Sequence, residues 1–298
     1  MRKNSYIFEF FITRLIKFTG YSTIIFVILI FFFLVNEGLP TFFQVQFSSL
    51  FSNRWYPIEE YFGIFPLISG SLVVTVGATI IAIPVGLCTA VFISEIAPGW
   101  ARDILKPSFE ILGGIPSVVL GFLGIIILSP YLRELFNLPT GLSAFTGSIL
   151  LAAMSLPTIV SIADDSLDAI PRSYRNASIA LGATDWQTIW HVTVPAARSG
   201  ILTAFMLGIG RTIGETMTVM MVTGNAPVSF KGLNSFFFPV RTMTATIAAE
   251  MGEVATGSVH YHVLFFVGLI LFLFSLFINL AASAVVFRQS KRSERLLS

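Results

Sequence analysis

Charged side chains are scarce in this sequence. Asp, Glu, Lys and Arg make up 11% of the 298 residues, and the formal net charge is only +2. Because soluble domains carry about 25% charged residues, this composition excludes an ordinary soluble domain. The basic residues are spread through short loops instead of clustering on a face, which argues against a nucleic-acid-binding protein.

Residues that carry out chemistry are also few. Cys88 is the one cysteine, which excludes an internal disulfide, and we expect it to be a small packing residue within an apolar run. His260 and His262 stand two apart without a carboxylate or thiol at ligand spacing, so we predict no metal site. The chain also lacks a Gly-x-x-x-x-Gly-Lys-Ser/Thr phosphate-binding loop and a nucleophile–base pair. We therefore predict a protein that is not an enzyme and binds no cofactor of its own.

Apolar residues fill the chain instead. They make up 55% of it, with 30 Phe and a mean hydropathy of +0.83. A helix needs about 20 apolar residues to cross a bilayer. The uncharged stretches predict an all-α membrane protein with six transmembrane helices, near Phe18–Val35, within Gly63–Ser94, and near Ile111–Ser129, Leu142–Ala163, Ser199–Val222 and His262–Phe287. The first is interpreted as a retained span, since no small-residue cleavage site follows it.

The distribution of Lys and Arg predicts the orientation of these spans. Thirteen of the 18 basic residues fall on one side, four on the other, and Arg211 lies within a span. Basic loops stay in the cytoplasm, so both termini are predicted to be cytoplasmic. The predicted organisation is a cytoplasmic segment (1–17), a transmembrane domain (18–287) and a basic cytoplasmic tail (288–298).

Prolines interrupt three of the predicted spans, at Pro84, Pro116 and Pro157. Each removes a backbone hydrogen bond and can kink its helix. The segment Gly113–Ser117 predicts the strongest break, as a shared packing kink or as part of a gate. Small residues at Gly121 and Gly124, and the Gly210-x-x-x-Gly214 spacing, predict close helix approach.

Residues 174–195 predict a helix-turn-helix outside the lipid. Small residues at helical spacing, Ala177 and Ala180, make a face that a partner can approach closely. Gly182 stands where the first helix would end, since glycine accepts the left-handed conformation there. Thr184 or Asp185 can cap a second helix that places Trp186, Ile189 and Trp190 on one side and ends at Pro195. The alternative is an ordinary amphipathic loop that rests on the membrane surface.

The fifth predicted span carries charge into the bilayer. Arg211, Gly214, Glu215 and Thr218 stand at i, i+3, i+4 and i+7, so a continuous helix would place them on one face. A charge at the centre of a membrane helix costs about 2.5–3.5 kcal/mol, which predicts that this face lines a polar pathway or a partner subunit. Arg211 would then present its two-pronged guanidinium to an oxyanion. The alternative is an Arg211–Glu215 ion pair that only holds helices together.

The segment before the last span is longer than a turn and covers residues 226–260. Its part Thr242–Val254 has a helix-forming composition and is apolar enough to lie in the membrane interface or to fold back into the protein. Glu250 and Glu253 are predicted to lie at the outer mouth of the pathway.

The spacing of the cytoplasmic loop resembles that of permease subunits of ABC importers. Their pattern is Glu-Ala-Ala, three residues, Gly, nine residues and Ile-x-Leu-Pro; Ala177, Gly182 and Pro195 match it, whereas Asn176 stands in the place of the Glu. This resemblance implies a type I, MetI-like permease fold. It also implies that Asn176, Ala177, Ala180, Gly182, Trp186 and Pro195 belong to a coupling surface for an ATPase.

Three further stretches resemble the permeases of the bacterial phosphate-specific transport system, and the PstC type more than its PstA partner. They are Gly210–Met217, Gly114–Ser117, and Arg241–Thr244 together with Ala248–Glu253. The resemblance implies import of inorganic phosphate across the inner membrane through Arg211, Glu215 and Thr218. It further implies a PstA-like sister permease, two ATPase subunits that bind ATP and Mg²⁺, and an extracytoplasmic phosphate-binding protein. Two alternatives remain: a permease for sulfate or molybdate, and a membrane scaffold for nutrient signalling that transports nothing.

Overall fold

Helices account for nearly all of the regular structure, as the apolar composition requires of a chain in lipid. The computed structural model describes residues 2–229 and 232–297; the predicted loop residue Lys231 and the side chains of the basic tail lie outside the described residues. The long helices are α1 (Arg2–Gly38), α4 (Phe65–Val91), α5 (Gly99–Gly113), α8 (Ala144–Asp168), α12 (Arg198–Gly214) and α15 (Val259–Leu297). The shorter ones are α2 (Thr41–Gln44), α3 (Phe47–Leu50), α6 (Ser117–Leu123), α7 (Ser129–Leu135), α9 (Arg172–Ala180), α10 (Asp185–Thr188), α11 (Val194–Ala196), α13 (Met217–Val222) and α14 (Met243–Glu250).

A two-stranded antiparallel hairpin, β1 (Trp55–Tyr56) and β2 (Tyr61–Phe62), is the only named sheet in the described part of the chain. Short 3-10 turns cover Pro57–Glu59 and Leu233–Phe237. Three π-helical turns extend neighbouring α-helices: η2 (Phe92–Ile96), η3 (Gly124–Leu128) and η4 (Ile189–Thr193).

Each π turn is followed, two residues later, by a proline. The prolines are Pro98, Pro130 and Pro195. Proline lacks an N–H and its ring collides with the carbonyl one turn back. A widened turn removes that collision, so we infer that η3 and η4 let the helix continue past Pro130 and Pro195. At Pro98 the helix ends instead, since Ala97 and Pro98 are both extended.

The predicted spans are found with shifted boundaries. Five described helical segments are long and apolar enough to cross a membrane: Phe10–Gln44, Phe65–Ile96, Ser117–Leu135, Ala144–Asp168 and Val259–Ala281. A sixth arises if the pair Asp185–Ala196 and Arg198–Gly214, bent by 71°, counts as one span. The third span begins at Ser117 instead of Ile111 because α5 ends at Gly113 and a new helix starts after Pro116. Pro84 and Pro157 lie inside continuous helices.

The fifth span is the main departure from expectation. The predicted continuous helix over Ser199–Val222 is broken, because α12 ends at Gly214, Glu215 is extended (φ −70°, ψ 129°), and α13 starts at Met217. The single face predicted for Arg211, Gly214, Glu215 and Thr218 therefore does not exist.

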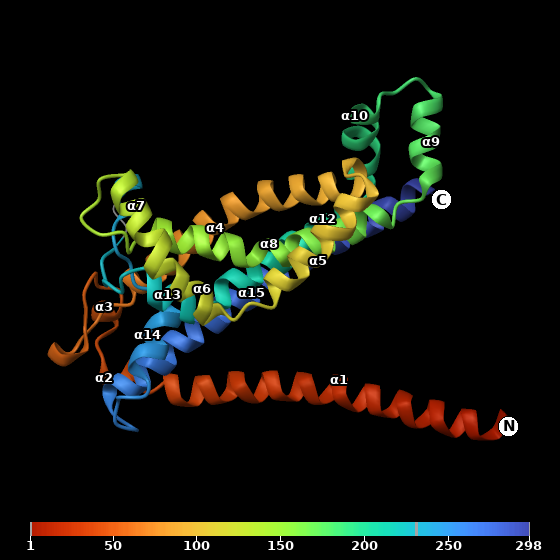
Figure 1. The fold of residues 1–298 in the computed structure, drawn as a ribbon. Helices are drawn as coiled ribbons and strands as arrows, with labels where there is room; N and C mark the ends of the chain where they lie inside the picture. Colours follow the sequence, from red (N-terminus) through yellow and green to blue (C-terminus); the bar gives the residue numbers. More distant parts are fainter. Residues whose placement is uncertain (1, 230–231, 298) are drawn as a thin grey trace.

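Figure 1 shows α4, α8, α12 and α15 running side by side, with α1 set apart along one edge. α9 and α10 lie at one end of this bundle, where α1 begins and α15 ends; α2, α3, α7 and the hairpin lie at the other. We call these the coupling end and the opposite end.

Three groups of buried apolar side chains follow one another along the bundle. The first joins α3, the hairpin, α4, α14 and α15. The second joins α4, α8 and α13, and the third joins α4, α8, η4 and α12. Because α4 contributes to all three and α8 to two, these helices form the axis around which the rest is packed.

Small residues bring two of the helices close together. A Cβ added to Gly121 would come within 2.8 Å of Met221 Sδ and 3.2 Å of Thr218 Cα, so glycine lets α6 lie against α13. By contrast, the predicted contact at Gly214 is absent among the described residues, since a Cβ there would meet nothing within 4 Å. Cys88, expected to be packed, is exposed on α4.

Candidate substrate pathway and coupling surface

Arg211 lies in the last turn of α12, beside the break in α5 and α6. Its Nη1 donates to Thr158 Oγ1 at 3.2 Å, and its Nη2 lies 3.5 Å from the carbonyl oxygen of Gly113. The residue is half-buried, and within the described part of the chain it forms no ion pair. A guanidinium with neutral partners keeps its full charge and further donors for an anion.

Glu215 does not pair with Arg211 among the described residues, so the predicted clamp is not formed. Its Oε1 accepts from the backbone N–H of Thr218 at 3.2 Å, which satisfies one of the free donors at the start of α13. The backbone carbonyl of Glu215 accepts from Thr244 Oγ1 at 3.0 Å. The extended residue is therefore held from both sides, and the helix cannot run through it.

Thr218 is fully buried and joins the two interrupted spans. Its hydroxyl donates to the carbonyl oxygen of Ser117 at 2.9 Å. Since Arg211 approaches Gly113 across the same gap, the α12–α13 break and the α5–α6 break lie side by side. Irregular backbone at membrane depth is tolerated where it is buried in protein or lines a cavity. The two adjacent breaks are therefore the part of the described structure that we take as the candidate substrate pathway.

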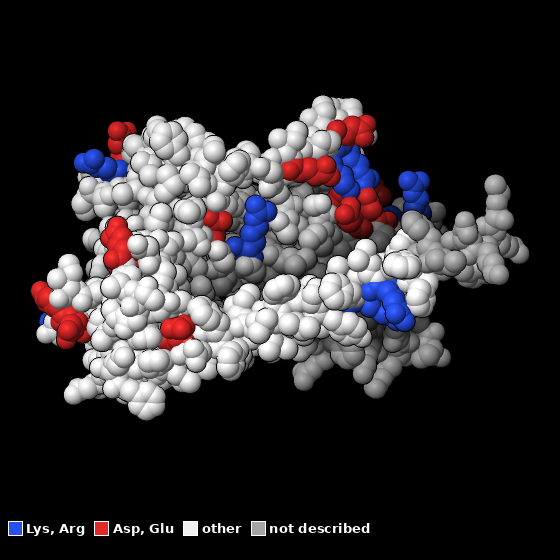
Figure 2. All heavy atoms as spheres, turned by 90° about the horizontal axis from the view of Figure 1, so that it is seen from below, with Lys and Arg blue, Asp and Glu red and all other residues white. Residues whose placement is uncertain are grey.

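Figure 2 shows one face of the molecule, hollowed along its length. Charged side chains gather toward its two ends, and the middle is mostly uncharged apart from a small group of charges in the hollow. This distribution is the one expected of a membrane-crossing bundle with a polar interior path.

The predicted helix-turn-helix is present at the coupling end. Gly182 has φ +87° directly after α9, as predicted for the residue that ends this helix. Thr184 caps α10 in a reciprocal capping box with Gln187. Trp186 and Trp190 lie together, with ring centroids 5.7 Å apart.

Every residue predicted for the coupling surface is exposed: Asn176, Ala177, Ala180, Gly182, Trp186 and Pro195. Apolar side chains accompany them, with Leu181 91% and Trp186 60% exposed. One detail of the prediction was wrong. The second helix does not end at Pro195 but continues through η4 to Ala196, because the π turn accommodates the proline; the chain bends by 71° after it.

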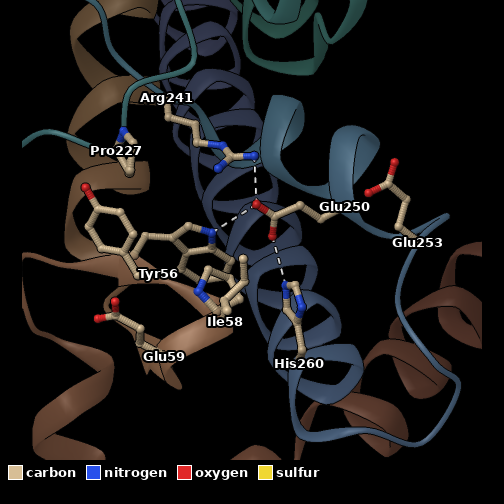
Figure 3. Close-up of a pocket in the computed structure, with 10 residues that line it drawn as sticks. Tyr56, Ile58, Glu59, Pro227, Arg241, Glu250, Glu253 and His260 are labelled. Atoms are coloured by element: carbon tan, nitrogen blue, oxygen red, sulfur yellow. Dashed lines mark hydrogen bonds and ion pairs between the residues drawn. The ribbon is translucent and has the colours of Figure 1, made fainter.

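Glu250 forms the centre of a polar network at the opposite end (Figure 3). Its Oε1 lies 2.7 Å from Arg241 Nη2 and accepts from Trp55 Nε1 at 3.1 Å, and its Oε2 lies 2.8 Å from His260 Nε2. Burial raises the pKa of this carboxyl, but the hydrogen bond from His260, the charge of Arg241 and the Trp55 N–H outweigh it, so the pKa lies below the ordinary 4.5.

This network borders a pocket of about 570 Å³. Glu253 and Glu59 line the same pocket and are exposed, and in Figure 3 they lie apart from the Glu250 network. The helix predicted within Thr242–Val254 folds back into the protein: it is α14, with Met243–Thr246 buried. The two predicted mouth residues thus differ, with Glu250 held in a network and Glu253 open. Among the described residues, no three His, Cys, Asp or Glu side chains are grouped to hold a metal ion.

Ion pairs at the coupling end were missed by the sequence reasoning. Lys106 of α5 lies 2.9 Å from Asp164 and 2.8 Å from Asp165 of α8, and these hydrogen bonds, with that to Asp164 the stronger, raise the pKa of Lys106 above 10.5. Arg102 pairs with Asp168. The only signal in the sequence was an acidic cluster after the fourth predicted span and two basic residues before the third.

The sequence matches a protein-family model over most of its length. Residues 82–292 match the family model of the binding-protein-dependent transport system inner membrane component. The chain belongs to this family.

Several relatives of the permease cover most of its length. A probable ABC transporter permease protein, YqgH of Bacillus subtilis, is 42% identical over 84% of this chain and 80% of the relative. The phosphate transport system permease protein PstC of Pasteurella multocida is 30% identical over 99% and 96%. PstC of Mesorhizobium japonicum is 34% identical over 86% and 82%.

A solved structure shows the same fold. The permease is similar to a chain in the inward-facing MetNI methionine ABC transporter, with a TM-score of 0.58 and 18% identity over 79% of this chain and 99% of that chain. The fold is therefore that of a MetI-like, type I ABC importer permease, an integral inner-membrane component that works with other subunits.

Proposed function

We propose that this permease imports inorganic phosphate through the inner membrane, with ATP and Mg²⁺ bound by separate subunits. The observation that carries the proposal is Arg211: a guanidinium inside the bundle, placed between two helix breaks and bonded only to neutral oxygens in the described structure. Guanidinium binds two phosphate oxygens at once and does not lose its charge. The relatives named as phosphate transport permeases support phosphate as the anion.

Glu215 has two tasks in this proposal. Its carboxylate holds the start of α13, and it places a negative charge four residues along the chain from Arg211. A pathway must not bind its cargo so tightly that it cannot leave. A nearby carboxylate lowers the affinity for an anion and so keeps binding reversible.

The coupling end indicates how the permease is oriented in the membrane. We infer that the exposed side chains of residues 174–195 dock on one of two ATPase subunits in the cytoplasm, that both termini lie on that side, and that a PstA-like sister permease completes the pathway. The opposite end, with Glu253 exposed near the pocket, then faces an extracytoplasmic phosphate-binding protein.

Substitutions at Arg211 test the proposal in vesicles that contain the whole transporter. Arg211→Lys keeps the charge but loses the fork, and hydrogen bonds to charged groups are worth about 1.5–3 kcal/mol. Phosphate uptake should therefore fall roughly tenfold or more, and Arg211→Gln should fall further. Arg198→Lys, at the start of the same helix, is the matched control and should import normally.

Competition with unlabelled anions tests the substrate. Unlabelled phosphate should suppress uptake of labelled phosphate, whereas sulfate and molybdate should not. If Arg211→Lys imports phosphate at the parent's rate, Arg211 does not contact the transported anion. If sulfate suppresses uptake as strongly as phosphate does, the permease is not specific for phosphate.

A further inference from the structure

The two helices of the coupling loop are attached to the membrane bundle in different ways. The second helix is held by apolar packing, since Ile189, Trp190 and Val194 join a core group with α4, α8 and α12. The first helix, α9, contributes no buried residue. α9 lies against η4, but its docking residues are all exposed and none of them joins the buried apolar groups of the bundle.

One side chain of α9 connects this helix directly to α4 and α8. Arg175 directs its guanidinium inward, where Nε lies 3.0 Å from Glu95 Oε2, and Nη2 also pairs with Glu95. Nη1 donates to the carbonyl oxygen of Ile170 at 2.8 Å, and Nη2 to that of Leu167 at 3.1 Å. The Arg175 side chain is 19% exposed and that of Glu95 8%.

The partners of Arg175 belong to the axis of the bundle. Glu95 lies in η2, the π turn that continues α4, and Leu167 lies in the last turn of α8. The carbonyl oxygen of Leu167 accepts from the guanidinium in addition to the backbone N–H of Ile170. Ser94, in the same π turn, donates to Asp168 of α8 at 3.0 Å. The end of α4 and the end of α8 are thus tied to each other and, through Arg175, to α9.

The other described side-chain bond of α9 stays within the loop. Ser178 Oγ accepts from Thr188 Oγ1 at 2.9 Å, which joins α9 to α10. It does not reach a membrane span. Apart from the backbone that joins α8 to α9, Arg175 is therefore the polar link from α9 to α4 and α8 in the described structure.

α8 leads from this link to the candidate pathway. It packs against α4 and α12 along much of its length, and it carries Thr158, which receives the Nη1 hydrogen bond of Arg211. A shift of the end of α8 would therefore displace Thr158 beside Arg211, because closely packed helices transmit displacement.

We propose that Arg175 and Glu95 are positioning residues that transmit movement of α9 to the ends of α4 and α8, and so couple ATP hydrolysis to transport. This inference rests on the proposed function. The fixed fork of arginine serves the carboxylate and the two carbonyls at the same time, whereas a lysine ammonium is a single point of charge and cannot span them.

The test uses the whole transporter in phosphate-importing vesicles, with uptake and ATP hydrolysis measured together. In Arg175→Lys and in Glu95→Gln, we expect the ATPase subunits to co-purify and basal hydrolysis to persist. The number of ATP molecules hydrolysed per phosphate imported should rise at least fivefold. Because the two residues act as one unit, the double variant should be no more than twofold worse than either single variant.

Arg172→Lys is the matched control, since Arg172 stands three residues earlier on α9 and is exposed; its ratio should equal that of the parent. The inference is overturned if the ratio of Arg175→Lys stays within twofold of the parent, if both arginine variants change it alike, or if Arg175→Lys loses its ATPase subunits. Failure of the proposed function looks different, because the parent itself would then import no phosphate.

Discussion

At the scale of single residues, substitution can separate the structural role of Glu215 from the electrostatic role that we propose for it. A side chain that accepts a hydrogen bond at a helix start is worth about 0.5–2 kcal/mol. Glu215→Ala should lower the free energy of unfolding by about 1 kcal/mol, because the N–H of Thr218 loses its partner. Glu215→Gln keeps an acceptor and should unfold close to the parent, yet its phosphate uptake should change because the negative charge is gone. Thermal unfolding in detergent and uptake in vesicles measure the two effects; unchanged uptake by Glu215→Gln would leave only the structural role.

Glu250 predicts a defined dependence of stability on pH. Its pKa is lower in the folded protein than the ordinary 4.5, so the folded state binds this proton less tightly than the unfolded state does. The stabilisation is complete above about pH 4.5 and is lost as the pH falls through the folded pKa. The difference in unfolding temperature between the parent and Glu250→Gln should shrink as the pH falls below about 4.5. Glu253→Gln, at an exposed site nearby, should show no such change; a Glu250→Gln difference that grows as the pH falls below about 4.5 would contradict the network.

At the scale of elements, Gly182 sets the geometry of the coupling loop. Its φ of +87° is unfavourable for a residue with a Cβ, and open space surrounds it, so backbone strain is the whole effect. Gly182→Val should cost roughly 1–2 kcal/mol locally and weaken association with the ATPase subunits, measured by co-purification. Gly182→Asn should be milder, because asparagine tolerates this conformation. Gly252→Val, also in open space but without a positive φ, is the control and should retain the ATPase.

Elements with local signals were predictable from the sequence, and those shaped by distant contacts were not. Gly182 ends one helix as predicted, and of the two predicted caps, Thr184 and Asp185, it is Thr184 that starts the next. The break at Glu215 has no such signal. It is held by Thr244, 29 residues away, and by the bond from Thr218 to Ser117, 101 residues away. The ion pair between Arg175 and Glu95 joins residues 80 apart in the sequence. It could not be predicted either, because it also depends on a distant contact.

At the scale of the whole molecule, the described structure separates three regions along one axis. The coupling end exposes residues 174–195, the middle holds Arg211 between two broken spans, and the opposite end carries the Glu250 network. α4 and α8 run through the packing groups that connect these regions. A displacement at one end can therefore reach the middle through packed helices, as the proposed coupling to an ATPase requires.

The orientation of this axis in the membrane is the last prediction. Thirteen of 18 basic residues belong to the side that carries the termini and the coupling loop, and basic loops remain in the cytoplasm. In a Cys88→Ser background, which removes the exposed native thiol, a membrane-impermeant thiol reagent should label Ile58→Cys in intact cells, since Ile58 is fully exposed at the opposite end. Arg172→Cys, on the exposed face of α9, should react only after the membrane is permeabilised. Labelling of Arg172→Cys in intact cells, with Ile58→Cys protected, would turn the molecule around and place the loop where no ATP-hydrolysing subunit could reach it.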